Sequence, residues 1–185
     1  MLAALALLGA PVAAQAQDAA PSAETVTEAE TVAEATEAAL FDAADIEATL
    51  AEVYAAISGP VGQERDWDAM RALFTPDARL TAITPNGLNG GTVDDYIERS
   101  GAFLTERGFT ESALVNRIEI YGDLAHAWSS YAGTWIDAEG AEQSVRGINS
   151  FQLVRQDDGR WLVQSIFWQA ETPDNPLPAD MVAQP

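Results

Sequence analysis

One histidine, His126, is the first candidate for chemistry in this chain of 185 residues. Histidine is the only side-chain type whose unperturbed pKa lies near neutrality, so it suits a general base or acid. Two polar residues could act with it: Tyr54 as a hydrogen-bond donor, and Asn149 as a polar group in an otherwise apolar strand. Each of the three also has a purely structural interpretation, because a buried polar side chain needs a hydrogen-bond partner in any fold.

The elements that must position these residues centre on two strand-like runs, 144–155 and 160–170, joined by a turn at 156–159. Asp-Gly between runs rich in β-branched and aromatic residues is typical of a β-hairpin. A hairpin of this kind cannot bury itself, so other segments must cover it.

Strand pairing predicts which residues share a face with His126. The turn after Ile136 is expected to place Ile136 opposite Ala141, and side chains at paired positions then lie on one face. A loop longer or shorter by one residue would reverse the set. The pairs expected on this face are His126 with Phe151, Trp128 with Asn149, and Ser130 with Gly147.

The turn at residues 122–123 leaves two registers open for the preceding hairpin. A two-residue turn places His126 opposite Glu119, which turns a charged residue inward together with His126. A three-residue turn buries Ile118 and Ile120 instead, and we prefer it for that reason.

Periodic apolar residues and capping residues predict three helices before these strands. The first is capped by Asp42 or Asp45 and ends at 58–60, the second is capped by Asp66 and ends at 75–76, and the third opens with the Thr92–Asp95 capping box. A strand at 79–84 and a loop at 85–91 lie between the last two helices. Strands at 112–121, 124–136, 144–155 and 160–170 follow. This order predicts an α+β fold with helices packed on one face of a curved antiparallel sheet.

Composition excludes several classes of partner. The formal net charge is -20, and all nine basic residues are arginine, so no nucleic-acid partner is expected. The chain has no cysteine, and its one histidine and scattered carboxylates give no recognised metal-ligand spacing. Residues 87–91 are glycine-rich but lack the lysine of a phosphate-binding loop. We therefore expect neither a metal nor a cofactor.

The N-terminal residues 1–16 are typical of a secretory signal peptide, with an apolar run from Leu2 to Leu8 and a small-residue cleavage pattern at 14–16. They depart from the usual pattern in having no basic residue before the apolar run. Export to the periplasm or outside the cell is expected, without stable membrane insertion after cleavage. We expect residues 17–41 to form an Ala/Glu-rich disordered linker, residues 42–171 to form the folded domain, and residues 172–185 to form a C-terminal tail.

The element order, with the segments DWDAMRALFTPDARL, RGINSFQLV and GRWLVQSIFWQAE, resembles the nuclear transport factor 2-like (NTF2-like) superfamily. The resemblance covers about residues 42–171 and is nearest to the bacterial SnoaL-like and ketosteroid-isomerase-like branches. It implies a cone-shaped fold with a pocket between three helices and the concave face of the sheet. It implies no single function, because this scaffold hosts several enzymes and also binding modules.

Matching the ketosteroid isomerase site to this chain places its oxyanion-hole tyrosine at Tyr54. Its general-base aspartate falls at about Ala82 and its protonated aspartic acid at about Phe151, and neither alanine nor phenylalanine can move a proton. The resemblance therefore implies no steroid isomerase of the usual mechanism. It does imply an apolar, aromatic pocket, and the ligand-binding residues expected there are Trp128, Ser130, Phe151, Gln164, Ile166 and Trp168.

The opposite face of the sheet is also expected to be apolar. A sheet that is apolar on both faces needs a cover on both, and the helices supply only one, so we expect a homodimer packed through the sheet. The residues assigned to this face are Tyr131, Trp135, Ile148, Val154, Trp161, Val163 and Phe167.

Three functional hypotheses follow from these patterns. The first is an exported protein that binds a small hydrophobic molecule between helices and sheet. The second is an enzyme of the same fold that transfers protons in an isomerase, dehydratase or cyclase reaction, with His126 as base and Tyr54 or Asn149 as donor. The third is a non-catalytic dimeric structural or protein-binding module whose pocket is filled core.

Overall fold

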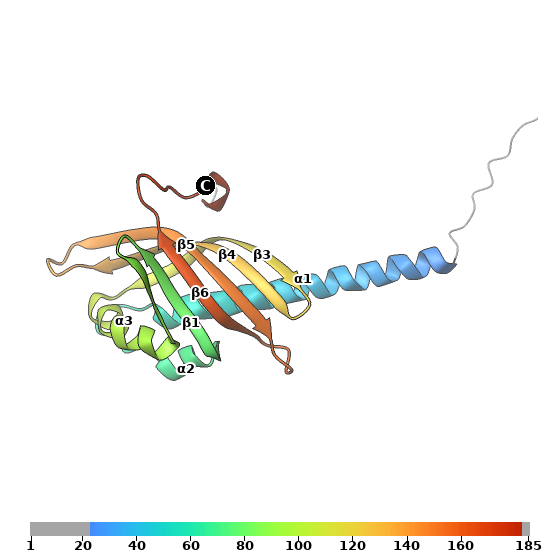
Figure 1. The fold of residues 1–185 in the computed structure, drawn as a ribbon, viewed down its shortest axis with the longest axis horizontal. Coiled ribbons are helices and arrows are strands. Elements are labelled where there is room, and N and C mark those ends of the chain that lie inside the picture. Colours follow the sequence, from blue (N-terminus) through green and yellow to red (C-terminus); the bar gives the residue numbers. More distant parts are fainter. Residues whose placement is uncertain (1–22, 183–185) are drawn as a thin grey trace, which may run out of the picture. The chain divides into compact units, whose positions relative to one another are not determined.

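The protein is described from a computed structural model that covers residues 23–182 (Figure 1). The chain divides into two units, Met1–Glu37 and Ala38–Pro185. Helix α1 (Ala23–Ile57) begins in the first unit and ends in the second. The expected signal peptide lies outside the described residues, so export stays a prediction.

The second unit combines helices with one curved, unclosed sheet, as expected for an α+β fold (Figure 1). The sheet has six strands in the order β2-β1-β6-β5-β4-β3. Neighbouring strands are antiparallel except for β1 and β6, which are parallel. The elements after α1 are α2 (Trp67–Arg71), β1 (Phe74–Thr84), β2 (Gly87–Gly91), α3 (Val93–Arg107), β3 (Thr110–Tyr121), β4 (Leu124–Ile136), β5 (Glu142–Arg155), β6 (Trp161–Ala170) and the 3-10 helix η1 (Ala179–Met181).

Two of the three predicted helix starts are confirmed. The Asp66 side chain accepts a hydrogen bond from Ala69 N at 2.9 Å and begins α2. Thr92 and Asp95 form the predicted capping box of α3. The cap predicted at Asp42 or Asp45 is wrong, because α1 begins at Ala23, within the stretch 17–41 that was expected to be a disordered linker. Alanine and glutamate, which dominate that stretch, favour helix.

Strand β2 was not predicted, because residues 85–91 have the composition of a loop. In the structure Gly87 lies opposite Thr84 and Gly91 opposite Leu80, so the chain forms a hairpin across the two-residue turn at 85–86. Glycine is required in two ways here. Gly87 adopts a φ of 104°, and a Cβ on Gly90 would lie 2.4 Å from the Thr81 Oγ1 atom.

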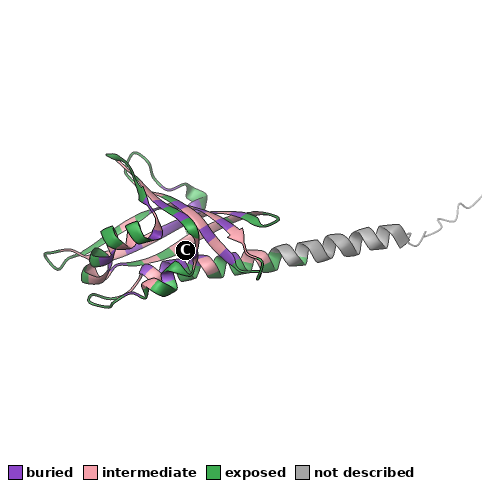
Figure 2. Ribbon diagram, turned by 60° about the horizontal axis from the view of Figure 1, so that its bottom comes forward, coloured by how far each residue is buried: buried purple, intermediate pink, exposed green. Residues whose placement is uncertain are grey.

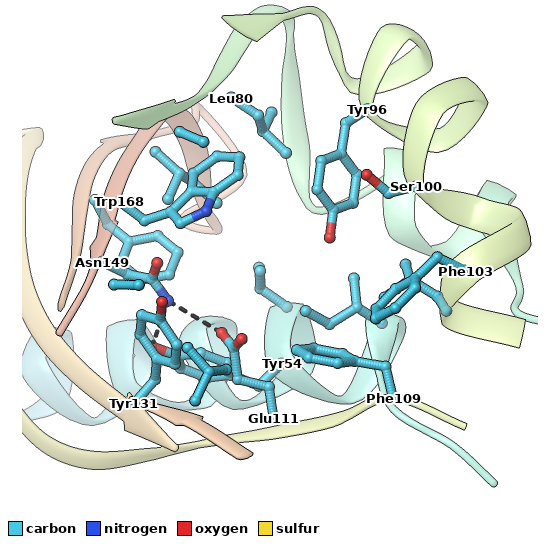
Figure 3. A pocket seen from close by; sticks show the side chains of 18 of the residues that line it. Tyr54, Leu80, Tyr96, Ser100, Phe103, Phe109, Glu111, Tyr131, Asn149 and Trp168 are labelled. Atoms are coloured by element: carbon cyan, nitrogen blue, oxygen red, sulfur yellow. Dashed lines mark hydrogen bonds between the residues drawn. The ribbon is translucent and has the colours of Figure 1, made fainter. Parts of the chain in front are cut away.

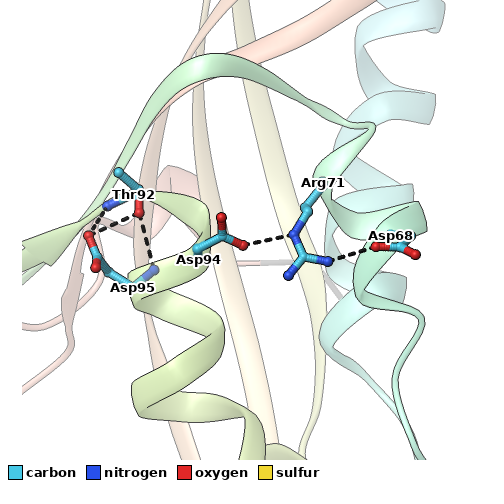
Figure 4. A network of polar contacts seen from close by, with 5 residues as sticks. All are labelled: Asp68, Arg71, Thr92, Asp94 and Asp95. Carbon is cyan, nitrogen blue, oxygen red and sulfur yellow. Dashed lines mark hydrogen bonds and ion pairs between the residues drawn. The ribbon is translucent and has the colours of Figure 1, made fainter.

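An arginine holds the short helix α2 against the start of α3 (Figure 4). Arg71 Nε lies 2.8 Å from the Asp94 carboxylate, and Arg71 Nη1 lies 2.8 Å from the Asp68 carboxylate. These side chains are largely exposed, so each pair contributes at most about 1 kcal/mol. The Arg71–Asp94 pair links α2 to the first turn of α3, which forms one wall of the cavity described below.

The register of β4 on β5 differs by one residue from the predicted register. Ile136 lies opposite Glu142, not Ala141, so His126 pairs with Gln152, Trp128 with Ser150, and Ser130 with Ile148. The loop is one residue longer because the Asp137 carboxylate accepts hydrogen bonds from Glu139 N at 3.0 Å and Ala141 N at 2.8 Å. An aspartate that binds its own loop in this way competes with the strand ladder.

This shift reverses the face that was assigned to His126, Trp128 and Ser130. The alternate residues of β4, Ala127 and Ser129, face the helices and are buried, whereas His126, Trp128 and Ser130 face the other side of the sheet. Buried and half-buried residues alternate along β5 from Gly147 to Leu153, and Figure 2 shows buried and intermediate positions interspersed along the strands of the sheet.

The preferred three-residue turn at 122–123 is also wrong. Glu119 lies opposite His126, as the two-residue alternative requires, and Ile118 lies opposite Ala127 on the helix-facing side. The two-residue turn therefore places Ile118, which is half-buried, on the core side and turns Glu119 and His126 outward together.

The outer face of the sheet is the face that α1, α2 and α3 leave uncovered. Ile148, Val154 and Phe167 lie on it as expected, and Phe167 is 43 % exposed. The other four expected members belong to the core side: Tyr131, Trp161 and Val163 are buried in the core cluster, and Trp135 packs against Phe103 and Phe109. Homodimerisation through the outer face stays a prediction.

The C-terminal segment is more ordered than a tail. Leu177 and Met181 are buried, Leu177 N donates to the Glu171 carboxylate at 2.9 Å, and Arg117 forms an ion pair with Asp180 at 3.0 Å. The segment after β6 therefore packs on the domain.

Candidate functional site

A cavity of about 420 Å³ lies between the helices and the concave face of the sheet (Figure 3). Its walls are apolar and aromatic, and its exposed members Ile83, Pro85 and Phe103 show that it reaches the surface between the end of β1 and α3. A cavity of this size and composition fits a small-molecule site. Its apolar lining includes Val53, Ile57, Met70, Phe74, Leu80, Leu104, Phe109, Val145, Phe151, Ile166 and Trp168.

Glu111, at the start of β3, carries the one carboxylate in this lining, and the described lining residues include no lysine, arginine or histidine. Burial raises the pKa of Glu111 to about 7, although a hydrogen bond from Asn149 acts in the opposite direction. Removing water from a carboxylate without supplying a positive charge has this effect. The group therefore exchanges protons near neutral pH.

Asn149, on β5, holds the Glu111 side chain in place. Its Nδ2 atom donates to Glu111 Oε1 at 3.2 Å and to the Tyr54 hydroxyl at 3.1 Å. The Tyr54 hydroxyl also lies 2.7 Å from Ser129 Oγ. The Tyr54 hydroxyl accepts from Asn149 and shares a second hydrogen bond with Ser129 in which either oxygen can donate, so Tyr54 orients the Asn149 amide.

Two further tyrosines line the cavity. The hydroxyl of Tyr96, on α3, points into the cavity on the side opposite Glu111 (Figure 3). Burial raises the pKa of Tyr96 and of Tyr131, and the charge of Glu111 raises both further. Both hydroxyls therefore keep their protons at neutral pH. Tyr131 covers Gly147, where a Cβ would lie 2.6 Å from the tyrosine oxygen.

Five of the predicted site residues meet around this cavity. Tyr54 and Asn149 are hydrogen-bonded partners, and Phe151, Ile166 and Trp168 line the walls. Ala82 and Phe151, the positions that match the two isomerase aspartates, also line it. The cavity therefore lacks acids at the two positions where the isomerase has them.

The other four predicted residues lie elsewhere. Trp128 and the buried Ser130 are on the outer-facing positions of β4 with His126, whose Nε2 atom lies 3.2 Å from Ser150 Oγ. The one-residue register shift is the cause. Gln164 is not in the lining, because a bulge in β6 skips it in the ladder with β5, and its Oε1 accepts from Thr75 Oγ1 at 2.8 Å.

Glu111 was missing from the sequence-based candidates. The predicted strand began at residue 112, one position after it, so its face was not considered. One signal could have identified it: Glu111 is two residues before Ala113, which packs against the core, and alternate strand residues share a face. An acidic residue at an inward position of an otherwise apolar sheet is a candidate site residue.

Within the described part of the chain, no group of three His, Cys, Asp or Glu side chains is placed to hold a metal ion. Among the same residues, no helix has the length and apolar content needed to cross a bilayer.

Solved structures with the same fold include an NTF2-like superfamily protein from Salmonella enterica serovar Typhimurium LT2. It has 16 % sequence identity and a TM-score of 0.59, and the match covers 76 % of this chain and 95 % of that chain. A protein from Novosphingobium aromaticivorans DSM 12444, provisionally named a scytalone dehydratase, has 18 % identity and a TM-score of 0.62 over 81 % of this chain and 96 % of that one. No curated protein sequence matches this chain.

These structural similarities define the fold as that of the NTF2-like superfamily. The family model of the SnoaL-like domain matches residues 38–166, so the chain belongs to the SnoaL-like family.

Proposed function

We propose that this protein is an enzyme that transfers a proton on a small, uncharged, largely apolar substrate, with Glu111 as the general base. The observation that carries the proposal is the placement of one carboxylate in an apolar cavity that has no cationic side chain in its described lining. A base whose pKa lies near 7 is present in both protonation states at neutral pH, which suits proton abstraction followed by return.

The charge of the cavity limits the substrate class. A carboxylate, sulfate or phosphate group would meet Glu111 and no compensating cation, and it would lose its hydration on entry. Aromatic walls such as Trp168, Phe109 and Phe103 favour a cyclic apolar body. An uncharged ketone with a ring system fits both conditions.

The reaction follows from the positions of Glu111 and Tyr96. The Glu111 carboxylate removes a proton from the carbon next to the substrate carbonyl, and the electron pair of the broken C–H bond forms the enolate. The Tyr96 hydroxyl, on the opposite side of the cavity, donates a hydrogen bond to the enolate oxygen. Return of the proton from Glu111 to another carbon completes an isomerisation. Alternatively, the enolate re-forms the carbonyl and expels a hydroxyl from the β carbon, which takes the proton from Glu111 and leaves as water, and this completes a dehydration.

Two earlier observations fit this proposal. A protein with the same fold is provisionally named a scytalone dehydratase, although identity of 18 % shows the fold alone. The cavity is also open space, so an interpretation of the domain as a module with a filled core loses its support. Binding of an unaltered ligand in the same cavity differs from the proposal only in the absence of proton transfer.

Hydrogen–deuterium exchange tests the proposal without knowledge of the natural substrate. 1-Tetralone, 2-tetralone and related neutral ketones are incubated in D₂O with the full-length chain, and exchange of the α protons is followed by proton NMR. We expect catalysed exchange for at least one ketone, its loss in Glu111→Gln, and its retention in His126→Ala. Exchange that Glu111→Gln leaves unchanged, or no catalysed exchange across the panel, would contradict the proposal.

A further inference from the structure

We infer that Ser58 is a positioning residue, which holds the backbone of Glu111 against the end of α1 so that the carboxylate stays inside the apolar cavity. The inference deepens the proposed function, because it concerns the base of that same site. It comes from a set of hydrogen bonds that join Ser58, the residue after α1, to the first residues of the edge strand β3.

The Ser58 hydroxyl makes three short contacts with two elements. It lies 2.7 Å from the Tyr54 carbonyl oxygen, to which it can donate, and it accepts from Glu111 N at 2.8 Å. It also lies 3.1 Å from the Glu111 carbonyl oxygen, which competes for the same hydroxyl proton. One side chain therefore accepts from the Glu111 amide and shares its proton between the carbonyl oxygens of Tyr54 and Glu111.

Strand β3 needs such a partner because it is an edge strand. It pairs with β4 on one side only, so alternate N–H and C=O groups point away from the sheet. The residues after α1 take the place of the missing strand: Gly59 N donates to Phe109 O at 2.9 Å, and Ser58 binds Glu111 two residues further on. The edge is closed next to the catalytic carboxylate.

A buried arginine keeps the Ser58 segment in place. Arg65 is 7 % exposed, and its guanidinium donates to Ile57 O at 3.1 Å, Gly59 O at 2.9 Å and Leu104 O at 2.8 Å. These bonds link the end of α1, the following loop and the end of α3. The position of Ser58 is thus fixed independently of Glu111.

The test is the titration of the Glu111 carboxyl in full-length protein labelled with ¹³C at the glutamate side-chain carboxyl. The Glu111 signal is assigned by its absence in Glu111→Gln. In Ser58→Ala, the two backbone groups of Glu111 need water instead of the hydroxyl, and this water also hydrates the carboxylate. We expect the titration midpoint to fall by about 0.5 pH unit or more, about a threefold change in the protonation ratio.

Thr49→Val is the matched control. Thr49 is on α1, and its hydroxyl joins the helix to the Trp161 carbonyl of β6 at 3.3 Å, away from the cavity lining. Both variants lose a side-chain hydrogen bond to a strand, but only Ser58→Ala is expected to move the Glu111 midpoint. Ser58→Thr, which keeps the hydroxyl, is expected to restore it. If Ser58→Ala does not fold, the isosteric Ser58→Cys, with its weaker hydrogen bonds, provides the same comparison.

The inference is overturned if Ser58→Ala titrates like the wild type, or if Thr49→Val moves the midpoint as much. The proposed function fails in a different way: the wild-type midpoint would then lie near the ordinary value for glutamate, whatever Ser58→Ala does.

Discussion

Tyr54 and Glu111 are connected twice, once through their backbones and once through their side chains. Ser58 Oγ bridges the Tyr54 carbonyl and the Glu111 amide at 2.7 and 2.8 Å, and Asn149 Nδ2 bridges the Tyr54 hydroxyl and the Glu111 carboxylate at 3.1 and 3.2 Å. These two bridges restrict both the backbone and the carboxylate of Glu111. They explain how a carboxylate is held in an apolar cavity.

Glu111→Gln should stabilise the protein at alkaline pH. Because the folded-state pKa is raised from 4.5 to about 7, the folded protein keeps a proton that the unfolded chain releases. Wild-type stability therefore falls as the pH rises from about 4.5 to about 7, and the glutamine variant avoids this loss. Urea unfolding at about pH 5 and about pH 8 should show the difference between the variants growing by about 2–3 kcal/mol in favour of glutamine. A constant difference at both pH values would be the opposite result.

Asn149→Ala should raise the pKa of Glu111 above its wild-type value. The amide donates to the carboxylate and so favours its ionised form, and alanine cannot. The carboxyl ¹³C titration measures the change. Asn116→Ala is the control, because Asn116 faces the same side as its cross-strand neighbour Ser129 but has no hydrogen bond to Glu111. A midpoint in Asn149→Ala that falls, or that matches the wild type, would show that the amide does not support the charge.

Tyr96→Phe should reduce catalysed α-proton exchange by about 100-fold, the usual effect of removing one donor to a developing oxyanion. The ring and its edge-on contact with Trp168, with centroids 6.1 Å apart, remain in the variant, so the loss should appear mainly in kcat. Tyr121→Phe, at an 87 % exposed position, is the control and should exchange like the wild type. Equal rates in the two variants would remove Tyr96 from the mechanism.

His126→Ala should leave both the exchange activity and the Glu111 midpoint unchanged. The imidazole is on the opposite face of the sheet from Glu111, beside Ser150. Both quantities are measured on the same preparation as the wild type. Loss of exchange with a normal thermal unfolding temperature would mean that the sequence-based choice of base was right and that Glu111 is not the base.

The fold was predictable because several local signals agree with it. The Asp66 cap, the Thr92–Asp95 capping box and the bounds of β4 can all be read from the sequence, and the apolar stripe of α1 is the buried stripe. Strand β2 was not predictable in this way, since a glycine-rich edge strand has no apolar alternation.

The site was only half predictable, because face assignment depends on a single residue of register. The Asp137 side chain lengthens the β4–β5 loop and reverses the face of His126. In a regular strand, residues three apart point to opposite faces. The bulge in β6 allows Val163 and Ile166 to face the same core in spite of this spacing. The inward Glu119 that a two-residue turn required was the available clue. Moving the pairing of β4 with β5 by one residue turns Glu119 and His126 outward and allows that short turn.

The most direct test of the central claim is the pH titration of the Glu111 carboxyl signal in the wild-type protein. A base poised in an apolar cavity predicts a midpoint at about 7. A midpoint at or below 4.5, the ordinary value for a glutamate, would contradict it.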